Sequence, residues 1–579
     1  RSTLFPYTTL FRSRDQKFFQ DMFADIDDVQ YFLEDIDGST GSIALPIRGI
    51  RRKVESFTQK NGITTSNLLN AVFAYTYSRF TGSNKVCYNF TEHGRHEDYL
   101  QDALGMFVRT VPILIDCENR PVGDFVTDTS DLILKSMANS SYPFRLLARE
   151  FNLTNDVVFE YNYDLLDFDI GNDMVVMEDA DSVSEFLCIV NDLEDGFVVS
   201  VSHMDKFSQN TAKQFVKAFK EILIQILEKE NLADIDYISK EDMELLNEYN
   251  KTDVELNYTD ILDAFNDNLS KHPDNTFVSY GDVSYTFAEG AFIADRIAKC
   301  LIDLEVNVQD CVGFLLPRSE LYALSVLGIM SMGAVYVPLD ETLPDDRVDF
   351  MIKDTQSKVL IVSDETYERG CNLANDCIIL NISDIINCEI EALNHLNVDY
   401  GDLACILYTS GSTGLPKGVK ITRKSILNFI DFHVNDLDIL SEDIYGLFAS
   451  IGFDVAMAAI FSAAYTGCCV NVIPEDIRLN IKALNEHFVK YGVTHTYITT
   501  QVAKMFIQEI ESSSLKVLVA GGEKLGEITE NRHYRIVDAY GPTEACVYVI
   551  SAATTDKIDS SSVGYVQNNT KAYILDDEK

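Results

Sequence analysis

The second half of the chain alternates short apolar runs with amphipathic stretches of helical length, and this alternation restricts the fold more than any other feature. Val312–Leu316 is followed by the helical stretch Ser319–Met332 and then by Ala334–Pro338. The same rhythm returns at Val359–Val362 and Val517–Ala520. Strands that are apolar on both faces and separated by helices are typical of parallel sheets covered on both sides. The pattern predicts an α/β fold whose ligands gather in the loops that follow the apolar runs.

The first half mixes helical and extended patterns. Thr64–Ser66 can cap a helix that ends before Gly82, and an extended run, Lys85–Phe90, follows. Apolar residues recur at helical spacing over Thr211–Glu230. The acidic stretch Lys229–Asp260, which has few apolar residues, has the composition of an inter-domain connection.

The length of 579 residues favours two or three domains. Residues 1–13 resemble a translated cloning scar, so we exclude them from fold reasoning. We predict a first domain over residues 14–230, a linker over 231–257 and a second domain over 258–579.

Composition excludes several classes of partner. The net charge of −44 repels phosphate backbones and anionic lipids, so neither nucleic acid nor a membrane is an expected partner. No apolar run approaches the roughly 18 residues of a membrane span. The 12 cysteines include no C-x-x-C pair, which argues against a zinc site or a disulfide framework. A reducing cytoplasm fits this cysteine usage.

The loop Tyr408–Gly418 follows the apolar run Leu403–Leu407 and carries the strongest chemical signal. Its glycines leave backbone N–H groups free to converge on an anion, its hydroxyls add donors, and its lysine adds a positive charge, which together suit a polyphosphate. It is not a Walker A loop, because Pro416 precedes the lysine and Gly418 follows it. The candidate phosphate-binding residues are Thr409, Ser410, Gly411, Ser412, Thr413, Gly414 and Lys417.

Two further loops follow strand-like runs. Asp538–Glu544 follows Tyr534–Val537, and its Gly541-Pro542 pair predicts a turn that presents Thr543 and Glu544. A carboxylate beside a triphosphate is most useful as a magnesium ligand. The third loop, Gly521–Glu523, would let a planar ring or a sugar lie against bare backbone.

These loops together resemble the adenylate-forming enzymes and, within them, the adenylation domains of nonribosomal peptide synthetases. Leu403–Gly418 is similar to the signature loop of that family nearly residue for residue. Met332–Asp340, Val283–Phe287 and Asp538–Glu544 resemble further family motifs. The resemblance runs in the family's order from about Tyr258 to the end of the sequence.

The upstream half resembles the later motifs of a condensation domain at Gly94-Arg95, Leu104–Val111 and Tyr142–Phe144. The family's H-H-x-x-x-D-G motif is absent, and the nearest histidines, His93 and His96, stand in a different setting, so we expect no condensation. The implied fold is a chloramphenicol-acetyltransferase-like condensation lobe ahead of a layered parallel-sheet α/β adenylation core.

The resemblance implies that a substrate carboxylate attacks the α-phosphate of Mg-ATP, giving an acyl-AMP and pyrophosphate. It implies catalytic roles for Thr409, Lys417 and Glu544, with Glu544 as the Mg²⁺ ligand. The residues that it implies around the nucleotide, besides the phosphate loop, are Gly521, Gly522, Glu523, Tyr540, Gly541, Thr543 and Glu544.

Substrate choice is expected to lie on Phe453-Asp454 and the residues after them. In adenylation domains that select an α-amino acid, an aspartate at this place pairs with the substrate ammonium, although Asp454 could instead cap the helix ahead of Val455. The implied side-chain pocket has only two hydroxyls and no charge, which predicts a neutral, mostly apolar amino acid. Ala458-Ala459 departs from the frequent Trp-Glu. The pocket residues are Val455, Ala458, Tyr497, Val519, Gly521, Ala539, Val547 and Tyr548.

The family's T-G-D loop, its lid domain with a lysine, and a carrier domain are not in the sequence. We therefore expect a truncated fragment with weak or no activity alone, whose partners are peptidyl carrier domains that bear phosphopantetheine outside this chain. Two alternatives stay open. One is an aryl or fatty acyl-CoA ligase, and the other is a non-catalytic docking module.

Overall fold

The computed structural model describes residues 5–24, 39–92, 104, 107–165, 171, 173–178, 184–374, 377–387, 403–410, 416–554 and 564–575. The chain divides into two compact units, residues 1–248 with 575–579 and residues 249–574. This division falls within the predicted linker, where η2 (Leu232–Asp234) and α8 (Lys240–Tyr249) form. Helix α1 (Phe5–Met22) begins inside the segment that resembles a cloning scar. The domain limits given above stay a prediction.

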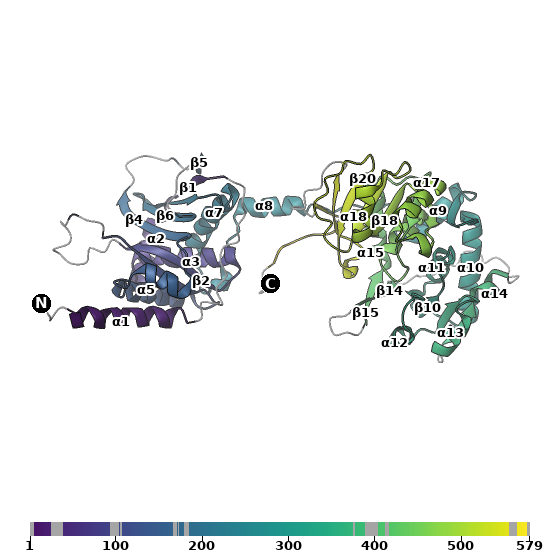
Figure 1. Ribbon diagram of the computed structural model, residues 1–579, viewed down its shortest axis with the longest axis horizontal. Coiled ribbons are helices and arrows are strands. Elements are labelled where there is room, and N and C mark those ends of the chain that lie inside the picture. The colour runs from purple at the N-terminus through teal and green to yellow at the C-terminus, as the bar shows by residue number, and fades with distance from the viewer. Residues whose placement is uncertain are drawn as a thin grey trace. The chain divides into compact units, whose positions relative to one another are not determined.

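The first unit is built on one seven-stranded sheet (Figure 1). In the order in which they pair, the strands are β3 (Arg109–Asp116), β2 (Lys85–Glu92), β4 (Val157–Leu165), β6 (Phe186–Asp192), β7 (Phe197–His203), β1 (Gly41–Ile47) and β5 (Val175–Glu178). The strand β4 pairs in parallel with β2 and β6, and the other pairs of this sheet are antiparallel.

Helices of the first unit cover this sheet around one apolar core. The predicted helix after Thr64 is confirmed: the Thr64 hydroxyl accepts a hydrogen bond from the Asn67 N–H, and the helix ends at Gly82, whose φ of 65° is left-handed. The helices are α2 (Arg51–Asn61), α3 (Thr65–Thr81), α5 (Val122–Ala138), α6 (Phe144–Phe151) and α7 (Gln209–Ile226).

The second unit contains two sheets (Figure 1). The six-stranded sheet consists of β13 (Ile378–Asn381), β12 (Val359–Val362), β10 (Cys311–Leu315), β11 (Val335–Pro338), β14 (Leu403–Ser410) and β15 (Pro416–Thr422). The nine-stranded sheet consists of β22 (Tyr565–Val566), β21 (Ile550–Thr554), β20 (Arg535–Tyr540), β19 (Val517–Gly521), β18 (His495–Thr499), β16 (Ile444–Leu447), β17 (Cys469–Val472), β8 (Thr276–Tyr280) and β9 (Val283–Thr286).

Helices line both faces of these sheets. Those of the second unit are α9 (Ile261–Lys271), α10 (Phe287–Asp303), α11 (Leu321–Ser331), α12 (Asp345–Thr355), α13 (Tyr367–Leu373), α14 (Ile382–Asn387), α15 (Arg423–Asp436), α16 (Val455–Thr466), α17 (Ile481–Tyr491) and α18 (Thr500–Glu509), with the short turns η3 (Glu475–Ile477) and η4 (Thr543–Ala545). One core takes residues from both sheets and from α9, α10, α11, α15 and α16. Two smaller cores cover the opposite faces.

The division of β19 between two cores explains the apolar runs. Val517 and Val519 belong to the core shared by the two sheets, whereas Leu518 and Ala520 belong to the core on the other face, with α17 and α18. A strand buried on both faces must be apolar at every position. The predicted α/β class with parallel-sheet layers is therefore confirmed.

The sheets are not wholly parallel, because β9, β15, β21 and β22 pair antiparallel with their neighbours. These four strands lie at or next to sheet edges, where a hairpin needs no helical crossover. Within the part of the chain that the structure describes, no helix is both long and apolar enough to cross a membrane.

Candidate active site

The predicted phosphate loop is the turn of a hairpin. Strand β14 continues to Ser410, and β15 begins at Pro416, with Thr409 opposite Lys417. The loop is therefore shorter than the sequence suggested, because its flanks continue the β ladder. Its centre lies outside the described residues, so the phosphate-binding roles there stay a prediction. The residues concerned are Gly411, Ser412, Thr413 and Gly414.

Lys417 and Glu544 form an ion pair that joins the hairpin to η4. The Lys417 Nζ lies 3.1 Å from a Glu544 carboxylate oxygen, and both side chains are more than half exposed. The backbone N–H of Glu544 and the Lys417 ammonium hold the pKa of this carboxyl below its usual value. The pair thus presents an ionised carboxylate and a cation at the surface beside the signature hairpin, as a site for phosphates and a divalent cation requires.

A cavity of about 360 Å³ lies beside this pair and brings together residues from three predicted motifs. Thr409 from the hairpin, Asp454 from the start of α16 and Thr543 from η4 all line it. Phe453, which begins the segment expected to determine substrate choice, lines it too. So do Asp340, Arg347 and Tyr408, which were not predicted as site residues.

Asp454 is buried, with 8% of its surface exposed, and no ion pair of its carboxylate occurs among the described residues. Burial raises the pKa of Asp454, and a hydrogen bond from Thr543 opposes that rise. Although Asp454 stands at the N-cap of α16, its side chain makes no capping hydrogen bond. The helix-cap alternative therefore lacks the contact that would define it.

Asp340, the other carboxylate of this cavity, has a different environment. It accepts hydrogen bonds from Ser450 and from the Thr342 hydroxyl, the latter at 2.6 Å. Although burial acts to raise the pKa of Asp340, these hydrogen bonds hold it below its usual value. Asp340 is thus held ionised by two hydroxyl groups, whereas for Asp454 the Thr543 hydroxyl and the nearby backbone N–H groups do not offset the effect of burial.

The backbone that leads to Asp454 is held by a buried arginine, Arg318. Its guanidinium donates to the carbonyls of Leu447, Phe448 and Ala449 at 2.7–3.1 Å and to Glu475 at 3.1 Å. A planar guanidinium with five donors can satisfy several carbonyls at once. Arg318 therefore fixes the end of β16, a few residues before Asp454.

The residues predicted to flank the nucleotide base lie at the ends of two neighbouring strands. Gly521 ends β19 and Tyr540 ends β20, and Gly522 has a φ of 104°. Glu523 is tied to α18 by hydrogen bonds with Thr500 and Gln501. The described lining of the 360 Å³ cavity does not include these residues. They stay a predicted nucleotide surface.

The predicted side-chain pocket residues converge in the core between the two sheets. Seven of the eight are buried, and Val455 is half-buried. The rings of Tyr497 and Tyr548 lie 6.2 Å apart, and a Cβ on Gly521 would overlap the Tyr497 hydroxyl. The only polar side-chain groups in this set are the hydroxyls of Tyr497 and Tyr548. The Tyr548 hydroxyl is already hydrogen-bonded to His433.

The pocket residues Val547 and Tyr548 belong to a strained turn. Cys546 and Val547 have φ values of 65° and 69°, which are rare for non-glycine residues and costly for a β-branched one. Gly541 packs against the backbone of Tyr548, and a Cβ there would overlap the Tyr548 Cα. The Gly541-Pro542 turn is thus needed for close approach as well as for the change of direction.

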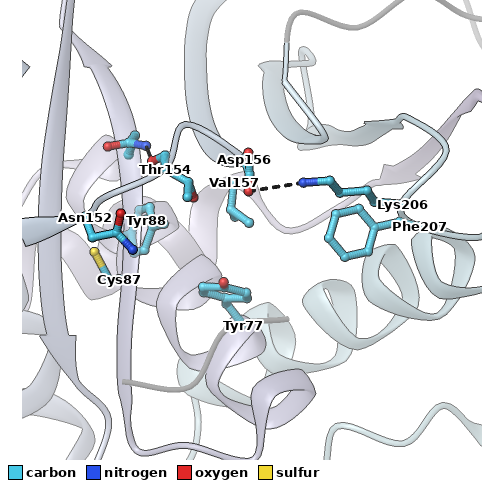
Figure 2. Close-up of a pocket in the computed structure, with 10 residues that line it drawn as sticks. Tyr77, Cys87, Tyr88, Asn152, Thr154, Asp156, Val157, Lys206 and Phe207 are labelled. Atoms are coloured by element: carbon cyan, nitrogen blue, oxygen red, sulfur yellow. Dashed lines mark hydrogen bonds and ion pairs between the residues drawn. The ribbon is translucent and has the colours of Figure 1, made fainter. Parts of the chain in front are cut away.

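The first unit contains a separate cavity of about 250 Å³, which Figure 2 shows. Lys206 Nζ lies 3.6 Å from Asp156 on one side, and the rings of Tyr77 and Tyr88 lie on the other. None of its lining residues belongs to the condensation-like motifs. The motif Gly94-Arg95 lies outside the described residues, and so do the neighbouring histidines His93 and His96.

Two curated proteins illustrate what the chain is similar to. Surfactin synthase subunit 2 of Bacillus subtilis (strain 168) is 28% identical over 547 residues, which cover 90% of this chain and 15% of that protein. Bacitracin synthase 1 of Bacillus licheniformis is 26% identical over 564 residues, which cover 94% of this chain and 11% of that protein. The chain spans less than one sixth of the length of these relatives.

Solved structures share the fold. The nonribosomal peptide synthetase FmoA3 (S1046A) superposes with a TM-score of 0.82 at 17% identity, covering 98% of this chain and 64% of that one. A four-domain nonribosomal peptide synthetase, holo-AB3403 bound to AMP and glycine, gives a TM-score of 0.80 at 19% identity, covering 97% of this chain and 45% of that one.

Two family models match the chain, in the order predicted from its motifs. The model described as "AMP-binding enzyme" matches residues 265–579, more than half of the chain, and the chain belongs to this family. The model described as "Condensation domain" matches residues 33–247. With both regions in this order, the chain is a condensation–adenylation segment of the nonribosomal peptide synthetase type, as its motifs predicted.

Proposed function

We propose that the second unit activates a neutral, mostly apolar amino acid with ATP. A carboxylate oxygen of the amino acid attacks the α-phosphorus, the bond to the β-phosphate bridging oxygen breaks, and aminoacyl-AMP and pyrophosphate form. The phosphopantetheine thiol of a carrier domain outside this chain then loses its proton and attacks the acyl carbon, so that a thioester forms and AMP leaves.

The environment of Asp454 carries this proposal. A buried carboxylate without a cationic partner is costly, and a substrate ammonium would remove that cost on binding. An aryl or fatty acid has no such group, so it would leave the charge unpaired. The burial of Asp454, its raised pKa and its place in a cavity with Thr409 and Thr543 therefore favour an α-amino acid.

The residues on the phosphate side have complementary roles. Lys417 and the Thr409 hydroxyl would bind the β- and γ-phosphates, where positioning and neutralisation of charge do most of the catalytic work. Glu544 is exposed and ionised, and so fits a Mg²⁺ ligand. When bound, Mg²⁺ supplies charge neutralisation on the phosphate oxygens.

A panel of non-hydrolysable aminoacyl-adenylate analogues tests the proposal. We expect apolar analogues to raise the melting midpoint, because binding stabilises the folded chain by about 2.7 kcal/mol at 100 times the Kd. Analogues with charged side chains should do so far less, since their charge would be buried without a partner. Equal shifts by aryl- or fatty-acyl-adenylate analogues, which lack the α-ammonium, would contradict the assignment of Asp454.

Replacing Lys417 by alanine separates phosphate binding from stability. The Lys417–Glu544 pair is exposed, so its loss should leave the melting midpoint of the free chain unchanged. Binding of Mg-ATP should weaken roughly tenfold, the effect of one charge-assisted hydrogen bond. Lys420→Ala removes the same charge from the same strand and should not weaken binding. An equal loss in both variants would show a general charge effect instead.

A further inference from the structure

His433 lies at the centre of a buried hydrogen-bonded group behind the predicted side-chain pocket. It belongs to α15 and is fully buried. Its Nδ1 lies 2.8 Å from the Tyr548 hydroxyl, and its Nε2 lies 3.0 Å from the Tyr445 hydroxyl. One imidazole ring thus connects a helix, the strand β16 and the strained segment that ends in Tyr548.

The His433 ring is neutral, because burial lowers its pKa to about 3. A neutral imidazole has one N–H donor and one bare nitrogen acceptor. It can therefore donate to one phenol while it accepts from the other, and in either tautomer the Tyr548 oxygen is bonded to His433. The histidine pairs with both phenols without burying a charge.

The ring of Tyr548 contacts both this group and a predicted pocket residue. Its centroid is 5.1 Å from that of Phe429, which belongs to α15 like His433. It is also 6.2 Å from the ring of Tyr497, a predicted pocket residue. The position of the Tyr548 ring therefore decides how much space remains on the Tyr497 side.

We propose that His433 is a positioning residue for substrate choice: by holding the Tyr548 hydroxyl, it fixes the ring that bounds the side-chain pocket. This role rests on the proposed function of the second unit. Without the imidazole, a space opens behind Tyr548 and its hydroxyl loses a partner. The ring then moves toward α15, and the pocket accepts larger side chains.

The test compares how tightly the chain binds two apolar aminoacyl-adenylate analogues, the one that the wild type prefers and one with a side chain longer by one or two carbons. We expect His433→Ala to change the ratio of the two dissociation constants at least about tenfold in favour of the longer side chain, the usual effect of one methylene in a fitted pocket. His433→Asn, whose amide can still pair with Tyr548, should restore most of the original ratio.

His487→Ala is the matched control for lost stability. His487 is also a buried histidine of the second unit, but its Nε2 lies 2.7 Å from the Asn471 amide oxygen, and its ring packs against that of Tyr491. Its replacement should lower the melting midpoint without changing the ratio of dissociation constants. Tyr548→Phe keeps the ring volume and the fold while removing the hydroxyl, and should change the ratio in the same direction as His433→Ala.

Two results would overturn this role in different ways. If the wild type binds the analogues, and neither His433→Ala nor Tyr548→Phe changes the ratio, His433 is only structural and the proposed function stands. If the wild type binds no analogue, the proposed function is wrong and the role of His433 is wrong with it.

Discussion

Replacing Asp454 by asparagine should stabilise the ligand-free chain at neutral pH and weaken the binding of aminoacyl-adenylate analogues by at least about 30-fold. The expected loss of affinity corresponds to about 2 kcal/mol, the lower end for breaking a buried charge pair. The gain in stability follows because asparagine removes a buried charge for which the described residues supply no cationic partner. Melting midpoints with and without the analogue measure both effects.

The effect on stability should depend on pH in a defined direction. Burial raises the pKa of Asp454 above its unfolded value of about 3.9, so between the two values the folded chain binds more protons than the unfolded chain. Stability then falls as pH rises through the folded pKa. Because asparagine cannot ionise, the advantage of the variant should be absent below about pH 4 and complete above the folded pKa.

Asp253→Asn is the matched control, since Asp253 is exposed in the same unit and the substitution makes the same change in net charge. It should alter neither the analogue affinity nor the difference in stability between acid and neutral pH. A variant of Asp454 that bound the analogue as tightly as the wild type would refute the pairing with the substrate ammonium.

The sheets of the second unit could be predicted because strands that are buried on both faces must be apolar at every position. Val359–Val362 and Val517–Ala520 are apolar at every position, and both are strands; the first lies between α12 and α13, and the second follows α18 and precedes β20. The hairpin of β14 and β15 could not be predicted in this way. Its residues Tyr408–Ser410 and Pro416–Gly418 read as a flexible loop because they include Ser, Gly and Pro, yet they continue the β ladder.

Part of the site was predictable because its residues stand in motifs with fixed order. Thr409, Asp454 and Thr543 come from three separate motifs, and the structure brings them to one cavity. Lys417 and Glu544, from two of these motifs, form an ion pair. Asp340 ended a recognised motif, but nothing in the sequence indicated that its side chain would line the same cavity.

The supporting residues could not be found from the sequence, because their partners are distant in the chain. Arg318 binds carbonyls about 130 positions away, and His433 binds a phenol 115 positions away. His433 stands among the buried residues of the amphipathic helix α15, near Phe429 and Val434, where a lone histidine looks like any other buried one. The role proposed for His433 rests on the two phenol hydroxyls, of Tyr445 and Tyr548, that lie within hydrogen-bond distance of its ring nitrogens.

Replacing Gly541 by alanine should remove analogue binding and lower the melting midpoint by a few degrees. The new Cβ would overlap the Tyr548 Cα and come within 2.9 Å of the Val547 carbonyl oxygen and the Val549 nitrogen. These are backbone atoms, which cannot move aside as a flexible side chain would. Overpacking of this kind costs about 1–3 kcal/mol.

The loss of binding should exceed what the loss of stability explains. The displaced segment carries Val547 and Tyr548, two predicted pocket residues, and Tyr548 would be pulled from its bond to His433. Gly123→Ala, in the first unit, is the control for a glycine-to-alanine change outside the site, since a Cβ there would meet nothing closer than 3.5 Å. A Gly541→Ala chain that melted lower but bound the preferred analogue with unchanged affinity would show that this turn stabilises the fold without shaping the pocket.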